Sequence, residues 1–157
     1  MDGGFAPWVG TLIENLEQPI VIVAPKGREE EAVTRLARVG YDHCYGYLEN
    51  GMAAWENAGY ETDNITSVTP DEFAQQLTPE TTVVDVRRIG EINAGKMEHN
   101  NLIHLCLDDI NHQYKQLDKN KEYYVHCAGG YRSLIAISIL NQKGFNHLVN
   151  VDQGFNG

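Results

Sequence analysis

Short apolar runs alternate along this chain with segments of helical periodicity. Six runs rich in β-branched or aromatic residues have the length of buried strands: 19–24, 45–48, 81–86, 102–107, 122–127 and 148–151. Between them, apolar residues recur three or four positions apart, as at Ala32 and Leu36, and the segment Leu134 to Leu140 is apolar almost throughout. This alternation predicts an α/β fold in which a mainly parallel sheet is flanked by helices.

One stretch of the pattern occurs twice. The first copy reads Pro19-Ile-Val-Ile-Val-Ala24-Pro-Lys-Gly27-Arg28, and the second reads Glu122-Tyr-Tyr-Val-His-Cys127-Ala-Gly-Gly130-Tyr-Arg132. Each run enters a loop that contains glycine and then an Arg, and a helical segment follows that ends at a Gly and an aromatic residue. Further on, both copies reach a similar ending, Gly51-Met52 in one and Gly154-Phe155 in the other.

The two copies differ in length. The second is preceded by two further strands and by a helix that opens with a capping box at Thr69-Pro70-Asp71-Glu72, whereas the first has room upstream only for a short helix over 8–16. We therefore expect three parts, namely the C-terminal part of a degenerate domain, a polar linker and a complete domain: residues 1–60, 61–67 and 68–157.

The composition is ordinary for a globular protein, and the charge restricts its partners. The 157 residues carry 12 Lys and Arg against 22 Asp and Glu, and this net charge of -10 argues against nucleic acid and anionic membrane as partners. No apolar run approaches the ~18 residues of a membrane span, and the N-terminus lacks the regions of a signal peptide. Three widely spaced cysteines and six scattered histidines predict neither a disulfide framework nor a metal site, so we expect a cytoplasmic protein without a metal.

The loop after strand 122–127 combines a nucleophile with an anion cradle. Cys127 ends the strand, at the edge of a parallel sheet where sites form. Gly129 and Gly130 let the backbone curl so that N–H groups point inward, and Arg132 adds a cation beside the helix that begins near Ser133. A thiolate in this setting has a lowered pKa, and the same groups would stabilise an anionic substrate or a persulfide.

Cys127 and the other reactive residues also have structural interpretations, in which they take no part in chemistry. Cys127 could itself be a small buried residue, but a structural cysteine has no use for an anion cradle. Asp85 and Arg87, which end another strand, are expected to form a structural hydrogen-bonded pair. His126 should point away from the Cys127 side chain because strand residues alternate. Cys106 could resolve a persulfide if it lies near Cys127, although its apolar neighbours favour a place in the core.

Residues 68–157 resemble rhodanese-family sulfurtransferases. The active-site loop of that family places four residues between a Cys and an Arg, as here between Cys127 and Arg132. The family's motifs outside the loop are matched by several residues: Asp85-Val86-Arg87, Glu91, Gly95 and Gly154-Phe155. The chain departs from the family in having Gly95-Lys96-Met97 in place of Gly-His-Ile, and Gln153 in place of the first Gly of a Gly-Gly-aromatic segment.

The resemblance implies a rhodanese-like fold and a sulfurtransferase activity that proceeds through a persulfide on Cys127, without a cofactor. It implies that Arg132 assists Cys127, that Asp85 and Arg87 support the loop, and that the remaining loop residues bind the substrate: Ala128, Gly129, Gly130, Tyr131 and Ser133. The partners would be a small sulfur donor, either thiosulfate or a low-molecular-weight persulfide, and a thiol or another thiophilic acceptor.

The first copy resembles the C-terminal part of a rhodanese domain without its nucleophile. Ala24 stands where Cys127 stands in the second copy, and its loop, 25–28, is one residue shorter. An inactive unit followed by an active one resembles the C-terminal region of bacterial fusion proteins that begin with a metallo-β-lactamase-fold domain. The resemblance therefore implies such a domain as a partner in a larger protein.

Two other functions fit parts of the sequence. A Cys-based phosphatase uses a related loop, but five residues separate its Cys from its Arg, so the shorter loop between Cys127 and Arg132 would close around an anion smaller than phosphate. A regulatory or docking module would fit the copy that carries Ala24. The intact loop at Cys127 indicates that the second copy is more than a docking module.

The first loop should not regain activity when its nucleophile is restored. In an Ala24→Cys, Cys127→Ser double variant we expect no transfer of sulfur from thiosulfate to cyanide, because the loop is short and Pro25 has no N–H to donate. The assay measures thiocyanate formation, with the wild-type chain as the positive control. Robust activity in the double variant would contradict the interpretation of the first copy as inactive.

Overall fold

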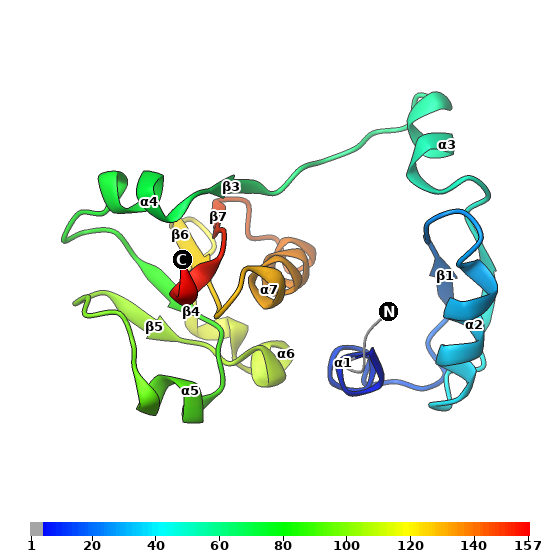
Figure 1. Ribbon diagram of the computed structural model, residues 1–157, viewed down its shortest axis with the longest axis horizontal. Coiled ribbons are helices and arrows are strands. Elements are labelled where there is room, and N and C mark those ends of the chain that lie inside the picture. The colour runs from blue at the N-terminus through cyan, green and yellow to red at the C-terminus, as the bar shows by residue number, and fades with distance from the viewer. Residues whose placement is uncertain (1–4) are drawn as a thin grey trace. The chain divides into compact units, whose positions relative to one another are not determined.

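Two units make up residues 5–157, the part of the chain that the computed structural model describes; one ends at Asp63 and the other spans Asn64–Gly157 (Figure 1). The first unit has three helices and a two-stranded parallel sheet: α1 Phe5–Leu12, β1 Ile20–Ile22, α2 Glu29–Ala37, β2 Cys44–Tyr47 and α3 Gly51–Asn57. The predicted order of strand, loop, helix, Gly-aromatic corner and second strand is therefore present in this unit.

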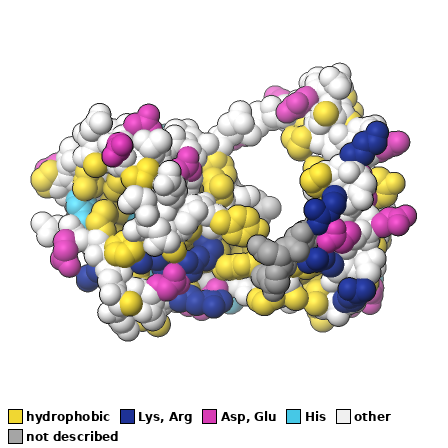
Figure 2. Space-filling model, viewed as in Figure 1, with side chains coloured by type: hydrophobic (Ala, Val, Ile, Leu, Met, Phe, Trp, Pro, Cys, Tyr) yellow, Lys and Arg dark blue, Asp and Glu magenta, His cyan; other side chains and the backbone are white. Residues whose placement is uncertain are grey.

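One face of the β1–β2 sheet is covered and the other is bare. Ile22 and Ala24 pack with the buried side chains of α2 and with Tyr41, whose hydroxyl donates to the carbonyl oxygens of Val9 and Ile13. The opposite face carries apolar side chains that lie between half and three quarters exposed: Val21, Val23, Tyr45 and Tyr47. Hydrophobic side chains are visible at the surface of the molecule in Figure 2.

The second unit is built around a five-stranded parallel sheet with the strand order β3-β7-β6-β4-β5. Its strands are short and its helices alternate with them in sequence: β3 Thr66–Val68, α4 Pro70–Gln76, β4 Val83–Asp85, α5 Ile89–Ala94, β5 Leu102–His104, η1 Leu107–Asp109, α6 Ile110–Gln113, η2 Tyr114–Gln116, β6 Tyr123–His126, α7 Tyr131–Gln142, β7 Leu148–Val151 and η3 Gly154–Asn156. The predicted α/β fold with a mainly parallel sheet is confirmed.

Helices cover both faces of this sheet, which is why its central strands are apolar. All three residues of β4 are buried, as parallel strands between two layers of helix require. On one face, α7 packs on β6 and β7 through Ala136, Ile137 and Leu140. On the other face, Phe73 of α4 packs against Val151 and the ring of Tyr124.

The helix α4 begins where the sequence predicts. The Thr69 hydroxyl accepts from the backbone N–H of Glu72, and the Glu72 carboxylate accepts from the backbone N–H of Thr69 at 2.8 Å, with Pro70 at the start of the helix. This reciprocal pair satisfies two N–H groups that have no partner within the helix. Phe73 is thereby fixed in the first turn, where it reaches the sheet.

Several predicted boundaries are wrong. The linker was expected to extend through residue 67, but Thr66–Val68 pairs with β7 as strand β3. Without this pairing the backbone N–H and C=O groups along the edge of β7 would have no hydrogen-bond partners in the sheet. The first helix spans Phe5–Leu12 and so covers only the front of the range 8–16. Strand β5 ends at His104 because the chain turns into helix η1 at Leu107.

The internal repeat is also a structural repeat at the turn that follows the second strand. In the first unit Asn50 and Gly51 have φ values of 61° and 60°, and in the second Gln153 and Gly154 have 59° and 55°. Consecutive left-handed residues are rare outside glycine, so the shared conformation marks equivalent positions. Within residues 5–157, no helix has both the length and the apolar character needed to cross a membrane.

Candidate active site

Cys127 follows the last residue of β6, at the carboxyl edge of the sheet. The loop continues through Ala128 and Gly129 to Gly130, and α7 begins at Tyr131, two residues earlier than predicted. Gly130 has φ of +86°, and a Cβ at this position would lie 3.1 Å from the backbone nitrogen of Gln153. Glycine is therefore needed here both for the turn and for the close approach of the C-terminal segment.

Hydrogen-bond donors converge on the sulfur of Cys127. The backbone N–H of Gly130 donates to Sγ at 3.1 Å, and the Ser133 hydroxyl lies 3.7 Å from it. Burial alone raises the pKa of the Cys127 thiol, but hydrogen bonds from the backbone and side chain of Ser133 and from the N–H groups of Gly129 and Gly130 lower it, and the net pKa lies below the ordinary value. The loop therefore favours the thiolate.

The buried hydroxyl of Ser133 has a second acceptor. Its Oγ donates to the carbonyl oxygen of Gly130 at 2.9 Å, which ties the first turn of α7 to the loop. Because a hydroxyl has one proton and two lone pairs, it can turn toward Sγ when the thiol ionises. Ser133 thus links the shape of the loop to the charge on Cys127.

The cation of the loop is held by a carboxylate. Both terminal nitrogens of the Arg132 guanidinium donate to the two carboxylate oxygens of Glu91 at 2.7 Å. This bidentate pair raises the pKa of Arg132 and lowers the pKa of Glu91 to about 2. The nearby Cys127 sulfur also raises the pKa of Arg132, so the guanidinium lies within electrostatic reach of the thiolate. The sequence indicated the cation, but gave no sign that Glu91 holds it.

A second ion pair, which is fully buried, lies at the base of the loop. The Asp85 carboxylate accepts from the Arg87 side chain at 2.7–3.0 Å and from the Arg87 backbone N–H at 3.0 Å. Arg87 also donates to the carbonyl oxygen of Gly95 and stacks on the ring of Phe155. The expected Asp85–Arg87 pair is therefore present, and its contacts are with the structural frame of the site.

The C-terminal segment closes over the loop. The backbone N–H of Phe155 donates to the carbonyl oxygen of Cys127 at 2.8 Å, and the N–H of Asn156 donates to the carbonyl oxygen of Ala128 at 3.1 Å. A Cβ on Gly154 would overlap the Cys127 carbonyl oxygen, so glycine is required there. These two hydrogen bonds turn the loop's carbonyl groups toward the C-terminal segment.

The sulfur is nearly covered, whereas the outer residues of the loop are exposed. Cys127 is 1% exposed, whereas Tyr131 is 65% exposed and Gly129 is exposed as well. The site is therefore a loop with accessible outer residues around a nearly covered sulfur.

Other residues of the sequence analysis lie outside this cluster. His126 is buried on the opposite side of β6 from the thiol, and burial lowers its pKa although the carboxylate of Asp85 raises it. Cys106 follows β5, which β4 separates from β6, so two strand spacings of about 4.8 Å each separate the two strands. Burial raises the pKa of Cys106, which makes it a poor resolving thiol. Arg88, which sequence reasoning passed over, forms an exposed ion pair with Asp108 at 2.7 Å.

Residues 5–157 contain no group of three or more His, Cys, Asp or Glu side chains arranged to hold a metal ion. The cluster around Cys127 instead offers one thiol with a lowered pKa, a set of N–H donors and an Arg132 guanidinium paired with Glu91. Such a site suits nucleophilic attack by sulfur on a small electrophile.

Comparison with known proteins agrees with this geometry. Residues 69–157, more than half of the chain, match the model of the rhodanese-like domain. The chain belongs to the rhodanese family. Two solved rhodanese structures are similar: a rhodanese-related protein from Thermoplasma volcanium has 30% sequence identity and a TM-score of 0.52, covering 58% of this chain and 87% of that one. The rhodanese-like domain protein from Staphylococcus aureus has 33% identity and a TM-score of 0.52, covering 57% and 87%.

Two relatives of this rhodanese come from Bacillus subtilis (strain 168). The candidate sulfurtransferase YtwF is 35% identical over 72 residues, which are 46% of this chain and 67% of YtwF. The candidate sulfur carrier protein YrkF is 26% identical over 101 residues, which are 63% of this chain and 54% of YrkF. This chain thus spans about half of the length of YrkF.

The lowered pKa of Cys127 should appear in its reactivity. We expect the rate of alkylation of Cys127 by iodoacetamide to inflect below the ~8.5 of a free thiol, because four hydrogen bonds to the sulfur outweigh its burial. Ser133→Ala should raise the inflection, whereas Ser138→Ala, at an exposed position of the same helix, should leave it unchanged. Peptide mass spectrometry follows each cysteine separately. An inflection at or above the free-thiol value would show that the N–H groups do not act on the sulfur.

The closure of the loop should depend on Gly154. We expect Gly154→Ala to lower the free energy of unfolding by roughly 2–4 kcal/mol, because the added Cβ collides with the Cys127 carbonyl oxygen at a left-handed backbone position. Gly90→Ala, in α5 with open space around it, serves as the matched control and should be neutral or slightly stabilising. Urea denaturation measures both. Equal stability of the two variants would contradict this account of the segment.

Proposed function

We propose that this rhodanese is a sulfurtransferase that carries sulfane sulfur as a persulfide on Cys127. The observation that supports this most directly is the lowered pKa of a thiol surrounded by inward-facing N–H groups. An ionised thiol attacks sulfur far better than a neutral one. The family match and the relative YtwF, named as a candidate sulfurtransferase, point to the same class of reaction.

In the first half-reaction, the Cys127 thiolate attacks the sulfane sulfur of the donor. A bond forms between Sγ and that sulfur while the donor's own bond to it breaks, and the electron pair leaves with sulfite or, from an organic persulfide, with a thiolate. The transferred sulfur keeps the negative charge that it carried in thiosulfate or in an ionised persulfide, so the outer sulfur of the Cys127 persulfide is anionic. The N–H groups of Gly129 and Gly130 and the guanidinium of Arg132 are placed to stabilise that charge.

In the second half-reaction, an acceptor attacks the outer sulfur. A thiolate, sulfite or cyanide forms a bond to it, the sulfur–sulfur bond breaks, and the electron pair returns to Cys127 as the thiolate. No electrons enter or leave the pair of half-reactions, so the cycle uses no redox cofactor. Ala128 and Tyr131 form the outer part of the loop and would contact donor and acceptor, with Asp85 and Arg87 supporting the loop from below.

The first unit has no counterpart of this chemistry. Ala24 occupies the position of Cys127, and Gly51 approaches its carbonyl oxygen as Gly154 approaches that of Cys127, with 3.2 Å from a Cβ on Gly51 to the Ala24 oxygen. We therefore propose that the unit is an inactive rhodanese-like copy. The proposed setting is the cytoplasm, within a bacterial protein that also carries a metallo-β-lactamase-fold domain.

Sulfur loading tests the function. After incubation with thiosulfate or glutathione persulfide, we expect the wild-type chain to gain the mass of one sulfur atom on Cys127, and Cys127→Ser to gain none, because a serine hydroxyl does not ionise in this loop. Cys44→Ser and Cys106→Ser retain Cys127 and should load normally. Circular dichroism checks that each variant is folded. Loading of Cys127→Ser on another cysteine would contradict the proposal, as would a wild-type chain that neither donor modifies.

A further inference from the structure

Charged side chains follow the strands beside the one that ends at Cys127. Strand β4 pairs with both β5 and β6, so the segments that follow these three strands leave the sheet at one edge. The backbone N–H of Val86, just after β4, donates to the carbonyl oxygen of His126 at the end of β6. Arg88 and Asp108 come a few residues after β4 and β5, and both therefore lie beyond the edge that carries the active-site loop.

Arg88 is joined to the active-site loop through Glu91. The same carboxylate oxygen, Oε2, accepts from the backbone N–H of Arg88 at 3.0 Å and from the Arg132 side chain at 2.7 Å. The Arg132 guanidinium in turn interacts with the Cys127 sulfur. The carboxylate of Asp108 raises the pKa of Arg88, and the nearby charge of Arg132 opposes this effect. The two guanidinium groups are therefore neighbours at the mouth of the loop.

The Arg88 side chain is turned toward solvent. It is 60% exposed, whereas the side chains of Arg132 and Arg87 are 18% and 3% exposed. Its Nε donates to the carboxylate of Asp108 at 2.7 Å, and Asp108 is itself 32% exposed. Exposed ion pairs contribute little to stability because water solvates both charges. The pair can therefore exchange its internal contact for contacts with a charged ligand at small cost.

The pair presents a cation and an anion together, which favours one kind of ligand. A ligand carboxylate suits the planar guanidinium of Arg88, and a ligand ammonium group suits the carboxylate of Asp108. An α-amino acid group carries both charges on one carbon atom. Asp109, which is exposed and follows Asp108, adds a further negative charge. This rim therefore suits a zwitterion better than it suits a dianion such as thiosulfate.

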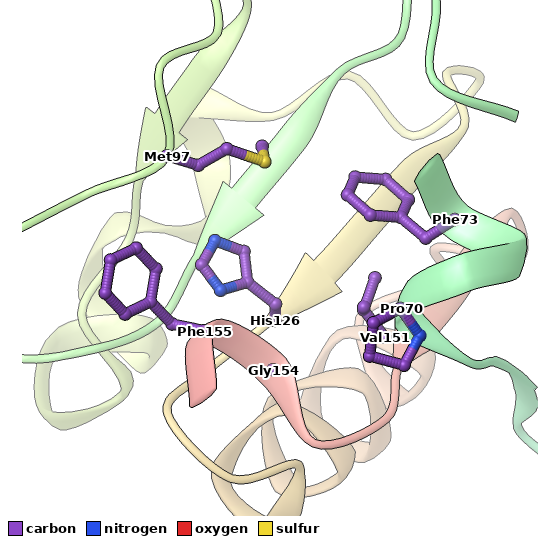
Figure 3. Close-up of a pocket in the computed structure, with 7 residues that line it drawn as sticks. All are labelled: Pro70, Phe73, Met97, His126, Val151, Gly154 and Phe155. Atoms are coloured by element: carbon purple, nitrogen blue, oxygen red, sulfur yellow. The ribbon is translucent and has the colours of Figure 1, made fainter. Parts of the chain in front are cut away.

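The apolar pocket of the same unit does not suit a charged group. Figure 3 shows the side chains around this cavity of about 190 Å³, on the face of the sheet that α4 covers. None of the residues that line it is Lys, Arg, Asp or Glu: Pro70, Phe73, Met97, His126, Val151, Gly154 and Phe155. Burial also lowers the pKa of the His126 imidazole, which disfavours its cationic form. The charged part of a donor is better accommodated at the Arg88–Asp108 rim.

We propose that Arg88 and Asp108 bind the α-amino acid group of an organic persulfide donor, the class that includes glutathione persulfide and cysteine persulfide. The inference rests on the proposed sulfur transfer at Cys127 and specifies its donor. The sulfane sulfur enters the loop while the charged group of the donor stays on the rim. The Arg88–Asp108 contact opens, and each side chain pairs with the opposite charge of the donor, so that no charge is left without a partner.

Single-turnover loading of Cys127 in the full chain tests the proposal. Glutathione persulfide or thiosulfate is added over a range of concentration, and mass spectrometry of quenched samples gives an apparent Kd and a maximal rate of loading. The Arg88→Gln, Asp108→Asn double variant removes both charges and leaves the net charge unchanged. We expect its apparent Kd for glutathione persulfide to rise roughly tenfold at a similar maximal rate. Its preference for this donor over thiosulfate should fall accordingly.

A matched control and a matched donor sharpen the test. The Arg28→Gln, Glu31→Gln variant removes a similarly exposed ion pair at the start of α2 in the first unit, and it should keep the wild-type preference. The persulfide of glutaryl-cysteinylglycine differs from glutathione persulfide only in lacking the ammonium group. We expect the wild-type chain to bind it more weakly than glutathione persulfide, and the double variant to treat the two donors alike.

A binding measurement separates this inference from the proposed function. S-methylglutathione carries no sulfane sulfur, and we expect its addition to shift the NMR resonance of the Arg88 Nε in the wild-type chain. An unchanged donor preference in the double variant, or no shift of Arg88, would overturn the inference while sulfur transfer at Cys127 stands. A chain that no donor loads, but in which S-methylglutathione shifts Arg88, would contradict the proposed function and retain the binding site.

Discussion

The active-site loop depends on two backbone hydrogen bonds that act on its carbonyl groups. The N–H groups of Phe155 and Asn156 hold the carbonyl oxygens of Cys127 and Ala128. Because the N–H and C=O groups of one planar peptide unit point in opposite directions, the hydrogen bond to the Ala128 carbonyl oxygen turns the N–H of Gly129, in the same peptide unit, toward the sulfur. Part of the field that lowers the pKa of the Cys127 thiol is thus fixed by a segment more than twenty residues further along the chain. The left-handed glycine at 154 permits this contact.

The charged side chains around the loop serve mainly to hold its frame. Arg132 is hydrogen-bonded to the carboxylate of Glu91, and Arg87 to that of Asp85, so each arginine of the site forms an ion pair. A fully buried pair such as Asp85–Arg87 contributes little net stability, but loss of one partner costs about 3–5 kcal/mol because it leaves an unpaired buried charge. The stabilisation of the thiolate therefore depends chiefly on backbone N–H groups, which carry no charge that needs compensation.

The two units share part of their local frame, and a cysteine stands at the strand end of only one of them. Both have a parallel strand pair, a left-handed turn after the second strand, and a glycine that approaches the carbonyl oxygen at the end of the first strand. Only the second has a sulfur at that strand end and enough glycine in the loop to surround it. The sheet face that α4 covers in the second unit is bare in the first, where Val21 and Val23 are exposed.

The sequence by itself determined the features that depend on neighbours along the chain. Apolar periodicity predicted the alternation of strands and helices, the capping box at Thr69 predicted the start of α4, and the spacing of Cys127, the glycines and Arg132 predicted an anion cradle. Only the tertiary structure decided which distant groups meet. The Glu91–Arg132 pair spans 41 residues, β3 joins the sheet beside β7, and Phe155 reaches Cys127. These contacts depend on the order and register of strands, which periodicity does not encode, because every strand of a parallel sheet has the same local pattern.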